Sequence, residues 1–199
     1  MRVLLSLLVF LLSAPAAFAQ APAVLRGAIV SMSADGQVIE ARTRAGEPAS
    51  VRLKPNVRVI GVEPASLNDL GPNAYIGVAA VPDGAAGLVA LEVHIFPEAM
   101  RGAGAGNRDF DLAPHSSMTN GALASRVESV DGPKLTVSYP GGSQTIRVDK
   151  STKIVAFTPG DRSELKAGAE IIARGTKGAD GVLEAAAVLV GRGGITPPM

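Results

Sequence analysis

The chain has 199 residues, with 19 Lys and Arg against 18 Asp and Glu, and it contains no cysteine. A nearly neutral chain lacks the basic surface that nucleic acids and anionic membranes attract, so the composition excludes both as partners. The absence of cysteine excludes disulfides and a lipid-modified N-terminal cysteine, so the apolar core alone must hold the fold. Abundant Gly and Pro and few aromatic residues favour short strands joined by tight turns.

Residues 1–19 are predicted to form a secretory signal peptide. Arg2 supplies a positive charge, Val3 to Leu12 form an apolar run, and Ala17-Phe18-Ala19 provides small residues around a cleavage site. The run is shorter than the ~20 apolar residues of a membrane span, and we expect no span in the mature chain. We predict cleavage after Ala19 and a periplasmic location. The mature chain would begin at Gln20 with 18 basic and 18 acidic residues, because only one charge is removed.

The sequence contains an internal repeat with a spacing of 95 residues, and this repeat is its most informative feature. The first copy covers about residues 23–96 and the second about residues 121–191. The matched apolar pairs are Val59 and Ile154, Ile60 and Val155, Leu70 and Leu165, Ile76 and Ile171, Val93 and Val188, and Ile95 and Val190.

Each copy is predicted to contain about five β-strands. Apolar and polar residues alternate through 38–42 in the first copy and through 134–139 in the second, which indicates strands with one buried face. Asp-Gly pairs mark the turns, because Gly readily adopts positive φ. These pairs begin at Asp35, Asp83, Asp131 and Asp180.

One short helical turn is predicted in each copy. Ser66 followed by Asp69, and Asp161 followed by Glu164, have the spacing of a capping box. In such a box the first side chain caps the turn, and the acid three residues later reaches back to the N–H of the cap residue.

The predicted fold is all-β, with two tandem small five-stranded OB-like barrels joined by an irregular connector. Five strands and one turn in ~75 residues fit a small closed or half-closed barrel. Two open sheets packed as one sandwich are the alternative. The predicted division is a signal peptide (1–19), a first small-β domain (20–96), a connector (97–120), a second small-β domain (121–191) and a C-terminal tail (192–199).

The order of these features resembles a known bacterial family. A Gly-led strand, an Asp-Gly turn, a second strand, a Gly turn, a Leu…Gly helical turn and a closing Asp-Gly…Ala strand resemble the domain of unknown function 5666 over both copies. The segment from His94 to Asn120 resembles the middle of uncharacterised exported proteins of Gram-negative bacteria, some of which carry a metal-transporter label. Those proteins commonly have Glu and His where this chain has Ala105 and Asn107, which implies a weaker metal role here. The resemblance implies a fold and an exported location, and no activity.

The connector is predicted to hold the binding site, because long segments of this kind in compact proteins tend to be functional. Its large apolar residues are unlike those of a free linker, and we expect it to dock across the groove between the two domains. There it would form one wall of a site for a ligand or partner. The candidate binding residues are Met100, Arg101, Arg108, Phe110, His115 and Met118.

A metal site is the alternative use of this region. The imidazoles and carboxylate of His94, Glu98 and His115 suit zinc, and nearby methionines would suit copper. The spacing matches no closed metal site. His94 also shares a strand face with Glu92 and Phe96, which favours a partly buried, hydrogen-bonded structural histidine.

The sequence does not predict an enzyme or a cofactor. The Gly-rich loop 102–106 lacks the Lys-Ser/Thr of a phosphate loop, and the chain has no Gly-x-Ser-x-Gly elbow. His115 beside Ser116 does not by itself make a catalytic pair. We predict an exported, non-enzymatic binding or scaffold protein of the bacterial envelope, with an envelope protein or a small ligand as partner. A periplasmic metal-binding or metal-delivery protein is the first alternative, and a small hydrolase is the second.

Export should shorten the chain at a defined point. We expect the intact mass of the envelope form, measured by mass spectrometry, to correspond to a chain that begins at Gln20. A form that retains Met1 and fractionates with the inner membrane would contradict the predicted cleavage.

Overall fold

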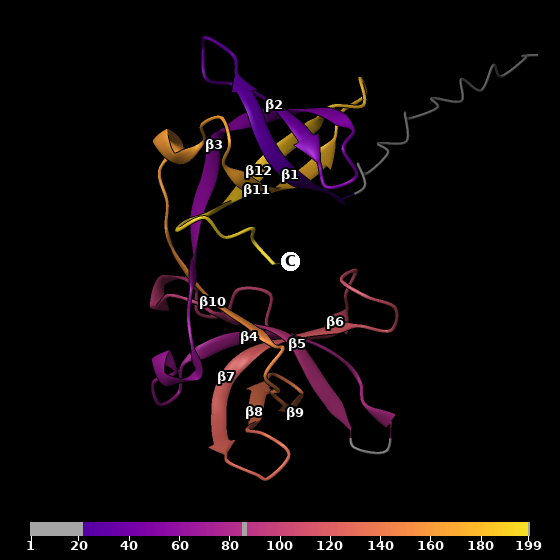
Figure 1. Ribbon diagram of the computed structural model, residues 1–199, viewed down its shortest axis with the longest axis vertical. Helices are drawn as coiled ribbons and strands as arrows, with labels where there is room; N and C mark the ends of the chain where they lie inside the picture. Colours follow the sequence, from indigo (N-terminus) through magenta and orange to yellow (C-terminus); the bar gives the residue numbers. More distant parts are fainter. Residues whose placement is uncertain (1–21, 85–86, 199) are drawn as a thin grey trace, which may run out of the picture.

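The computed structural model describes residues 22–84 and 87–198. The predicted signal peptide and the cleavage point before Gln20 lie outside this described part. The described residues form β-strands and short 3-10 turns with no α-helix among them, so the predicted all-β class is confirmed (Figure 1). None of their helical segments has the length and apolar character needed to cross a membrane.

The strands lie in two lobes that are joined along one side of the molecule (Figure 1). They are β1 (Pro22–Met32), β2 (Val38–Thr43), β3 (Pro48–Pro64), β4 (Tyr75–Pro82), β5 (Leu88–Ile95), β6 (Gly106–Asp109), β7 (Ser117–Val127), β8 (Lys134–Tyr139), β9 (Gly142–Arg147), β10 (Lys153–Pro159), β11 (Glu170–Lys177) and β12 (Leu183–Gly191). The 3-10 turns are η1 (Leu67–Asp69), η3 (Glu98–Met100) and η4 (Arg162–Glu164).

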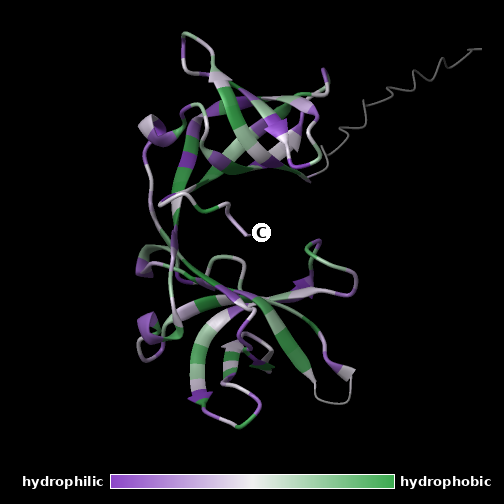
Figure 2. Ribbon diagram, in the orientation of Figure 1, coloured by the Kyte–Doolittle hydropathy of each residue, from purple (hydrophilic) through white to green (hydrophobic). Residues whose placement is uncertain are grey.

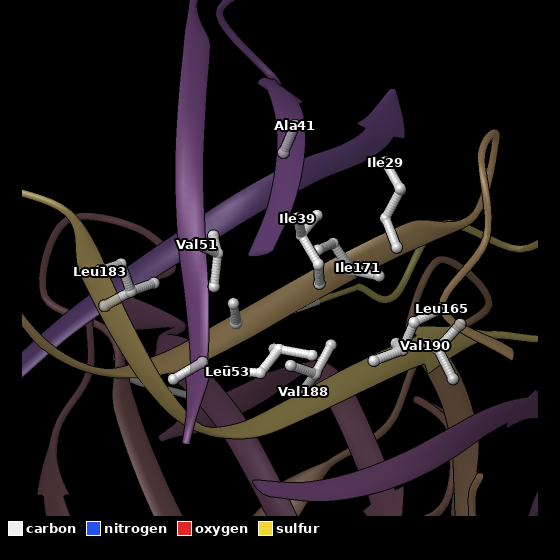
Figure 3. Close-up of a cluster of buried hydrophobic side chains, with 12 residues drawn as sticks. Ile29, Ile39, Ala41, Val51, Leu53, Leu165, Ile171, Leu183, Val188 and Val190 are labelled. Atoms are coloured by element: carbon white, nitrogen blue, oxygen red, sulfur yellow. The ribbon is translucent and has the colours of Figure 1, made fainter. Parts of the chain in front are cut away.

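Five strands close into a barrel in the first lobe. β1 pairs antiparallel with β2 and β11, β2 pairs with β3, and β11 pairs with β12. β12 then runs parallel to β3 and closes the ring. Alternating residues point inward and pack on one another in Figure 3. This core consists of Ile29, Ile39, Ala41, Val51, Leu53, Leu165, Ile171, Ala173, Leu183, Ala185, Val188 and Val190.

Five other strands pair in a ring in the second lobe. β4 pairs with β5 and β7, β7 pairs with β8, and β8 pairs with β9. β9 meets β5 through two residue pairs, and β6 adds to the edge of β7. Hydrophobic and hydrophilic residues alternate along the strands of both lobes in Figure 2. The second core consists of Ile76, Val78, Ala80, Ala90, Val93, Leu123, Leu135, Val137, Ile146 and Val148.

Both lobes take strands from both halves of the chain, and this differs from the predicted tandem arrangement. β11 and β12 complete the barrel that β1, β2 and β3 begin, while β4 pairs with β7 and β5 with β9 in the second lobe. Two tandem barrels are therefore not confirmed. The physical reason lies in β3, which is 17 residues long and carries the chain out of the first lobe before β4 begins. Alternation along the sequence specifies strands, but it does not specify which lobe each strand joins.

The two lobes are joined by β3 and β10, which cross side by side between them (Figure 1). Residues 60–64 of β3 pair antiparallel with residues 155–159 of β10, and Val62 lies opposite Phe157 at the centre of the pairing. β10 also runs parallel to β5. A third apolar cluster surrounds this crossing and contains Val62, Val155, Phe157, Ile172 and Leu189. Backbone hydrogen bonds and apolar packing therefore hold the lobes together.

Two glycines allow strands to approach closely at equivalent places in the lobes. A Cβ atom on Gly27 would lie 2.1 Å from the carbonyl oxygen of Arg42, and one on Gly121 would lie 2.1 Å from that of Ser138. Any side chain would force the backbone apart at these points. The Gly-led strands recognised in the sequence therefore have a steric cause.

Both predicted capping boxes are present. The Ser66 N–H donates to Asp69 Oδ2 at 2.7 Å, and the Ser66 hydroxyl accepts a hydrogen bond from the Asn68 N–H. The Asp161 N–H donates to Glu164 Oε1 at 2.8 Å in the same way. Each box begins a 3-10 turn of three residues, η1 in one case and η4 in the other.

Arg192, which follows β12, ties the η4 turn to β3. Its Nε donates to Glu164 Oε2 at 2.7 Å, and its Nη1 donates to Glu63 Oε1 at 2.6 Å. These Arg192 hydrogen bonds, with the backbone N–H of Asp161, hold the pKa of the Glu164 carboxyl at about 2, below its usual 4.5. Arg192 also lowers the pKa of Glu63. The ionised carboxylates therefore stabilise the junction between the lobes.

Acid should weaken this junction. The folded-state pKa of Glu164 lies below its ordinary value, so its contribution is fully present above about pH 4.5 and is lost as the pH falls toward about 2. We expect Glu164→Gln to unfold at lower urea concentration at pH 7, and its urea midpoint to change less than that of the wild type between about pH 5 and pH 2. Glu47→Gln, in an exposed turn, is the matched control. Equal pH profiles for both variants would contradict the assignment.

Candidate functional site

A cavity of about 200 Å³ lies between the two lobes. The first lobe contributes one wall from the outer faces of β3, β11 and β12. Because Val188 points into the barrel core, its neighbours Ala187 and Leu189 point outward to the cavity. Arg174 of β11 and Arg58 of β3 complete this wall, together with Ile60.

The second lobe contributes the opposite wall. Val93 faces the core of this lobe, so His94 and then Phe96 face the cavity. Met118 and Asn120 of β7 lie on the same wall. The Phe96 ring meets two other rings edge-on, with centroids 5.5 Å from Tyr75 and 5.1 Å from Phe157. Rigid aromatic side chains therefore fix the shape of this side.

The predicted connector forms the third wall. It contains η3, β6 and the first residues of β7, so it is more regular than expected; β6 was missed because Gly-Asn-Arg-Asp shows no apolar alternation. Met100 and Phe110 pack against the cluster between the lobes, so the segment docks there as expected. Four of the six predicted binding residues line the cavity, namely Met100, Arg108, Phe110 and Met118.

The other two predicted binding residues do not line the cavity. Arg101 pairs with Glu98, with Nε 2.5 Å from Oε1, and donates to the Asn73 carbonyl at 3.0 Å. Its guanidinium lies 5.7 Å from the centre of the Tyr75 ring. Arg101 therefore anchors the start of the connector. His115 is exposed at a turn with φ 60°, between β6 and β7.

His94 has the structural role that the sequence favoured. Its side chain is 1% exposed, its Nε2 lies 3.1 Å from Glu92 Oε2, and its ring stacks on Phe157 with centroids 5.3 Å apart. Glu92 is buried beside it. The pair satisfies two buried polar groups on the outer face of β5.

The three candidate metal ligands do not come together. His94 is buried against Glu92, Glu98 is exposed and bound by Arg101, and His115 is exposed at its turn. Within residues 22–84 and 87–198, no three His, Asp or Glu side chains are grouped closely enough to hold a metal ion.

Asn120 positions the connector over the cavity. Its Nδ2 donates to the Ala103 carbonyl at 3.0 Å, and the Tyr75 hydroxyl donates to the same oxygen at 3.3 Å. The Asn120 side chain lies directly over Gly77, where a Cβ atom would be 2.6 Å from its Oδ1. A larger residue at position 77 would therefore have to displace the Asn120 side chain that holds the connector.

The cavity is electropositive. Arg58, Arg108 and Arg174 line it, and no Asp or Glu is among the lining residues that the structure describes. Burial lowers the pKa of the Arg174 guanidinium, and the positive charges of Arg26 and Arg108 lower it further, while the negative charges of Asp111 and Glu92 act in the opposite direction. Asp111, an exposed carboxylate next to Phe110 in the sequence, receives two hydrogen bonds from Arg26 at 3.0 and 3.1 Å.

Several of these residues could not have been selected from the sequence. Arg58, Ile60, Ala187 and Leu189 lie on the outer face of a barrel, and they reach the cavity only because the strands are shared between lobes. Arg174 did carry a signal, because it is a charged residue directly after three buried apolar ones in β11. That signal is weak, since charged residues commonly lie on the solvent-facing side of a strand.

Residues 126–188 match the sequence profile of the domain of unknown function 5666 (DUF5666). The resemblance predicted from the sequence is thus confirmed for this stretch. No curated protein and no solved structure matches the chain significantly.

The matched stretch does not form one lobe. It begins near the end of β7 and ends within β12, so that β8 and β9 lie in the second lobe while β11 and most of β12 lie in the first. The matched stretch lines the cavity through Phe157, Arg174 and Ala187, and the other lining residues lie outside it.

Limited proteolysis can test how the connector is held. We expect trypsin to cut slowly after Arg101 and Arg108, because the first is bound to Glu98 and the second lies in β6. Fragments should stay together on a sizing column, since both lobes need strands from both sides of the cut. Lys150, in the exposed turn between β9 and β10, provides an internal reference for rapid cutting. Rapid cleavage into two fragments that separate would show a free linker.

Proposed function

We propose that this chain is an exported, non-enzymatic binding protein of the bacterial envelope that holds a small ligand between its two lobes. The export step rests on the signal-peptide pattern of residues 1–19. The binding role rests on the inter-lobe cavity. Ligand sites commonly form where two structural units meet, with mostly apolar walls and a few polar groups that orient the ligand.

One observation carries this proposal: three segments that are far apart in the sequence converge on one cavity. Met100 and Phe110 come from the connector, Leu189 from β12 and Phe157 from β10. A segment that served only to link domains would not be expected to place large apolar side chains beside positive charges at such a point. The same connector residues were selected from the sequence for their chemistry.

The lining residues support binding over catalysis. The usual nucleophiles of covalent catalysis are hydroxyl, thiol, amine and carboxylate groups, and the described lining contains no Ser, Thr, Cys, Lys, Asp or Glu. His94 is engaged by Glu92. Ser116 donates to the Phe110 carbonyl at 2.8 Å and caps the turn that holds His115.

We further propose that both lobes are small OB-like barrels, derived from two copies of one unit that have exchanged their last two strands. The strand register supports this view. Val188 of β12 lies beside Val59 of β3, and Val93 of β5 lies beside Ile154 of β10, so the same parallel pairing recurs 95 residues apart. Val62 and Phe157 are themselves equivalent positions, and they face each other at the crossing of the lobes.

Filling the cavity should abolish binding. We expect native mass spectrometry of protein isolated from the envelope to show a small bound mass that is absent from Ala103→Trp, because the indole would occupy the cavity. Ala167→Trp, in an exposed turn, is the control and should keep the bound mass. Circular dichroism would establish that both variants fold. A wild-type protein without bound mass, or a bound mass that survives in Ala103→Trp, would contradict the proposal.

A further inference from the structure

The charges of the inter-lobe cavity are of one sign. Arg58, Arg108 and Arg174 reach it from β3, β6 and β11, which belong to separate parts of the chain. Two carboxylates lie behind the walls: Asp111 pairs with Arg26, Glu92 lies beside His94, and both also act electrostatically on Arg174. Guanidinium groups thus outnumber carboxylates around the cavity, and this arrangement favours an anion over a cation or a neutral molecule.

The rest of the lining is apolar and the space is small. Ile60, Phe96, Met100, Phe110 and Leu189 provide aliphatic, aromatic and thioether surfaces. The volume of about 200 Å³ is below the roughly 300–1,000 Å³ of sites for drug-sized ligands. A bare inorganic anion would leave these apolar surfaces without contact. A nucleotide would exceed the space, and a sugar phosphate would bury hydroxyl groups against apolar walls.

We propose that the cavity binds a small organic monocarboxylate whose apolar body is about the size of one aromatic ring. Guanidinium groups match the planar carboxylate through paired N–H donors, and aromatic walls suit a flat apolar body. This inference rests on the proposed binding function and adds the class of ligand.

Arg108 offers the cleanest test of the charge requirement. Its guanidinium is exposed at the mouth of the cavity, and its Nη1 donates to the Gly104 carbonyl at 2.8 Å. Arg42 is a matched control, because it is also exposed and its Nη1 donates to the Gly46 carbonyl at the same distance of 2.8 Å. Arg42 does not line the cavity. Replacing either arginine removes one charge and one similar hydrogen bond.

The experiment is a calorimetric titration of the mature protein with benzoate, benzamide, benzylamine and inorganic phosphate. We expect benzoate to bind at least about tenfold more tightly than each of the others, and added salt to weaken its binding. Arg108→Gln should weaken benzoate binding by about tenfold, which corresponds to the loss of one charge-assisted contact. Arg42→Gln should leave it unchanged. Arg58→Gln provides a second cavity variant, in case Arg108→Gln disturbs β6.

The possible failures are distinguishable. Benzamide binding as tightly as benzoate, with loss in Ala103→Trp, would overturn the carboxylate preference and leave the proposed binding function standing. Phosphate binding as tightly as benzoate would overturn the need for an apolar body. If Arg42→Gln and Arg108→Gln weakened benzoate binding equally, benzoate would be attracted only to the positive charge of the surface, and the cavity would not be its binding site. Absence of benzoate binding would overturn the inference. The proposed binding function is tested separately by the bound mass in native mass spectrometry.

Discussion

The crossing of β3 and β10 is the constraint on which the rest of the structure depends. Backbone hydrogen bonds join the two strands where Val62 faces Phe157, at the point where the chain passes between lobes. Each strand also forms part of a parallel pair, β3 with β12 and β10 with β5. The crossing thereby fixes the separation and angle of the lobes. It also buries Phe157 and Leu189 in the cluster that lies behind the cavity.

The cavity is a consequence of this geometry and not of any single loop. The outer faces of two lobes joined along one side leave a space between them, and the connector covers part of it with Met100 and Phe110. Its chemistry comes from strand faces that would be ordinary solvent-exposed surface in an isolated lobe. Arg174 illustrates this point, because the second lobe and connector turn an outward-facing arginine into a largely desolvated one.

Local features of the fold could be predicted from the sequence because they depend on neighbouring residues. The strands at 38–42 and 134–139 follow from alternation, and the two capping boxes follow from the spacing of Ser66 to Asp69 and of Asp161 to Glu164. The sharing of strands could not be predicted, because β11 has the same apolar pattern whichever lobe it enters. The candidate site was found in part for the same reason. Connector residues stand out in sequence, whereas Arg58 and Leu189 matter only after the lobes are assembled.

The sharing of strands between the two halves of the chain also affects how the chain reaches its folded state. β1 pairs with β11, so Gly27 and Ile171, which are separated by most of the described chain, must come together before the first barrel closes. Such distant pairing costs loop-closure entropy and slows folding relative to a protein in which neighbouring segments pair. Until β11 and β12 arrive, β1 and β3 present unpaired edges that can join strands of another molecule. A chain of this kind therefore benefits from being kept apart from its copies until its last strands are available.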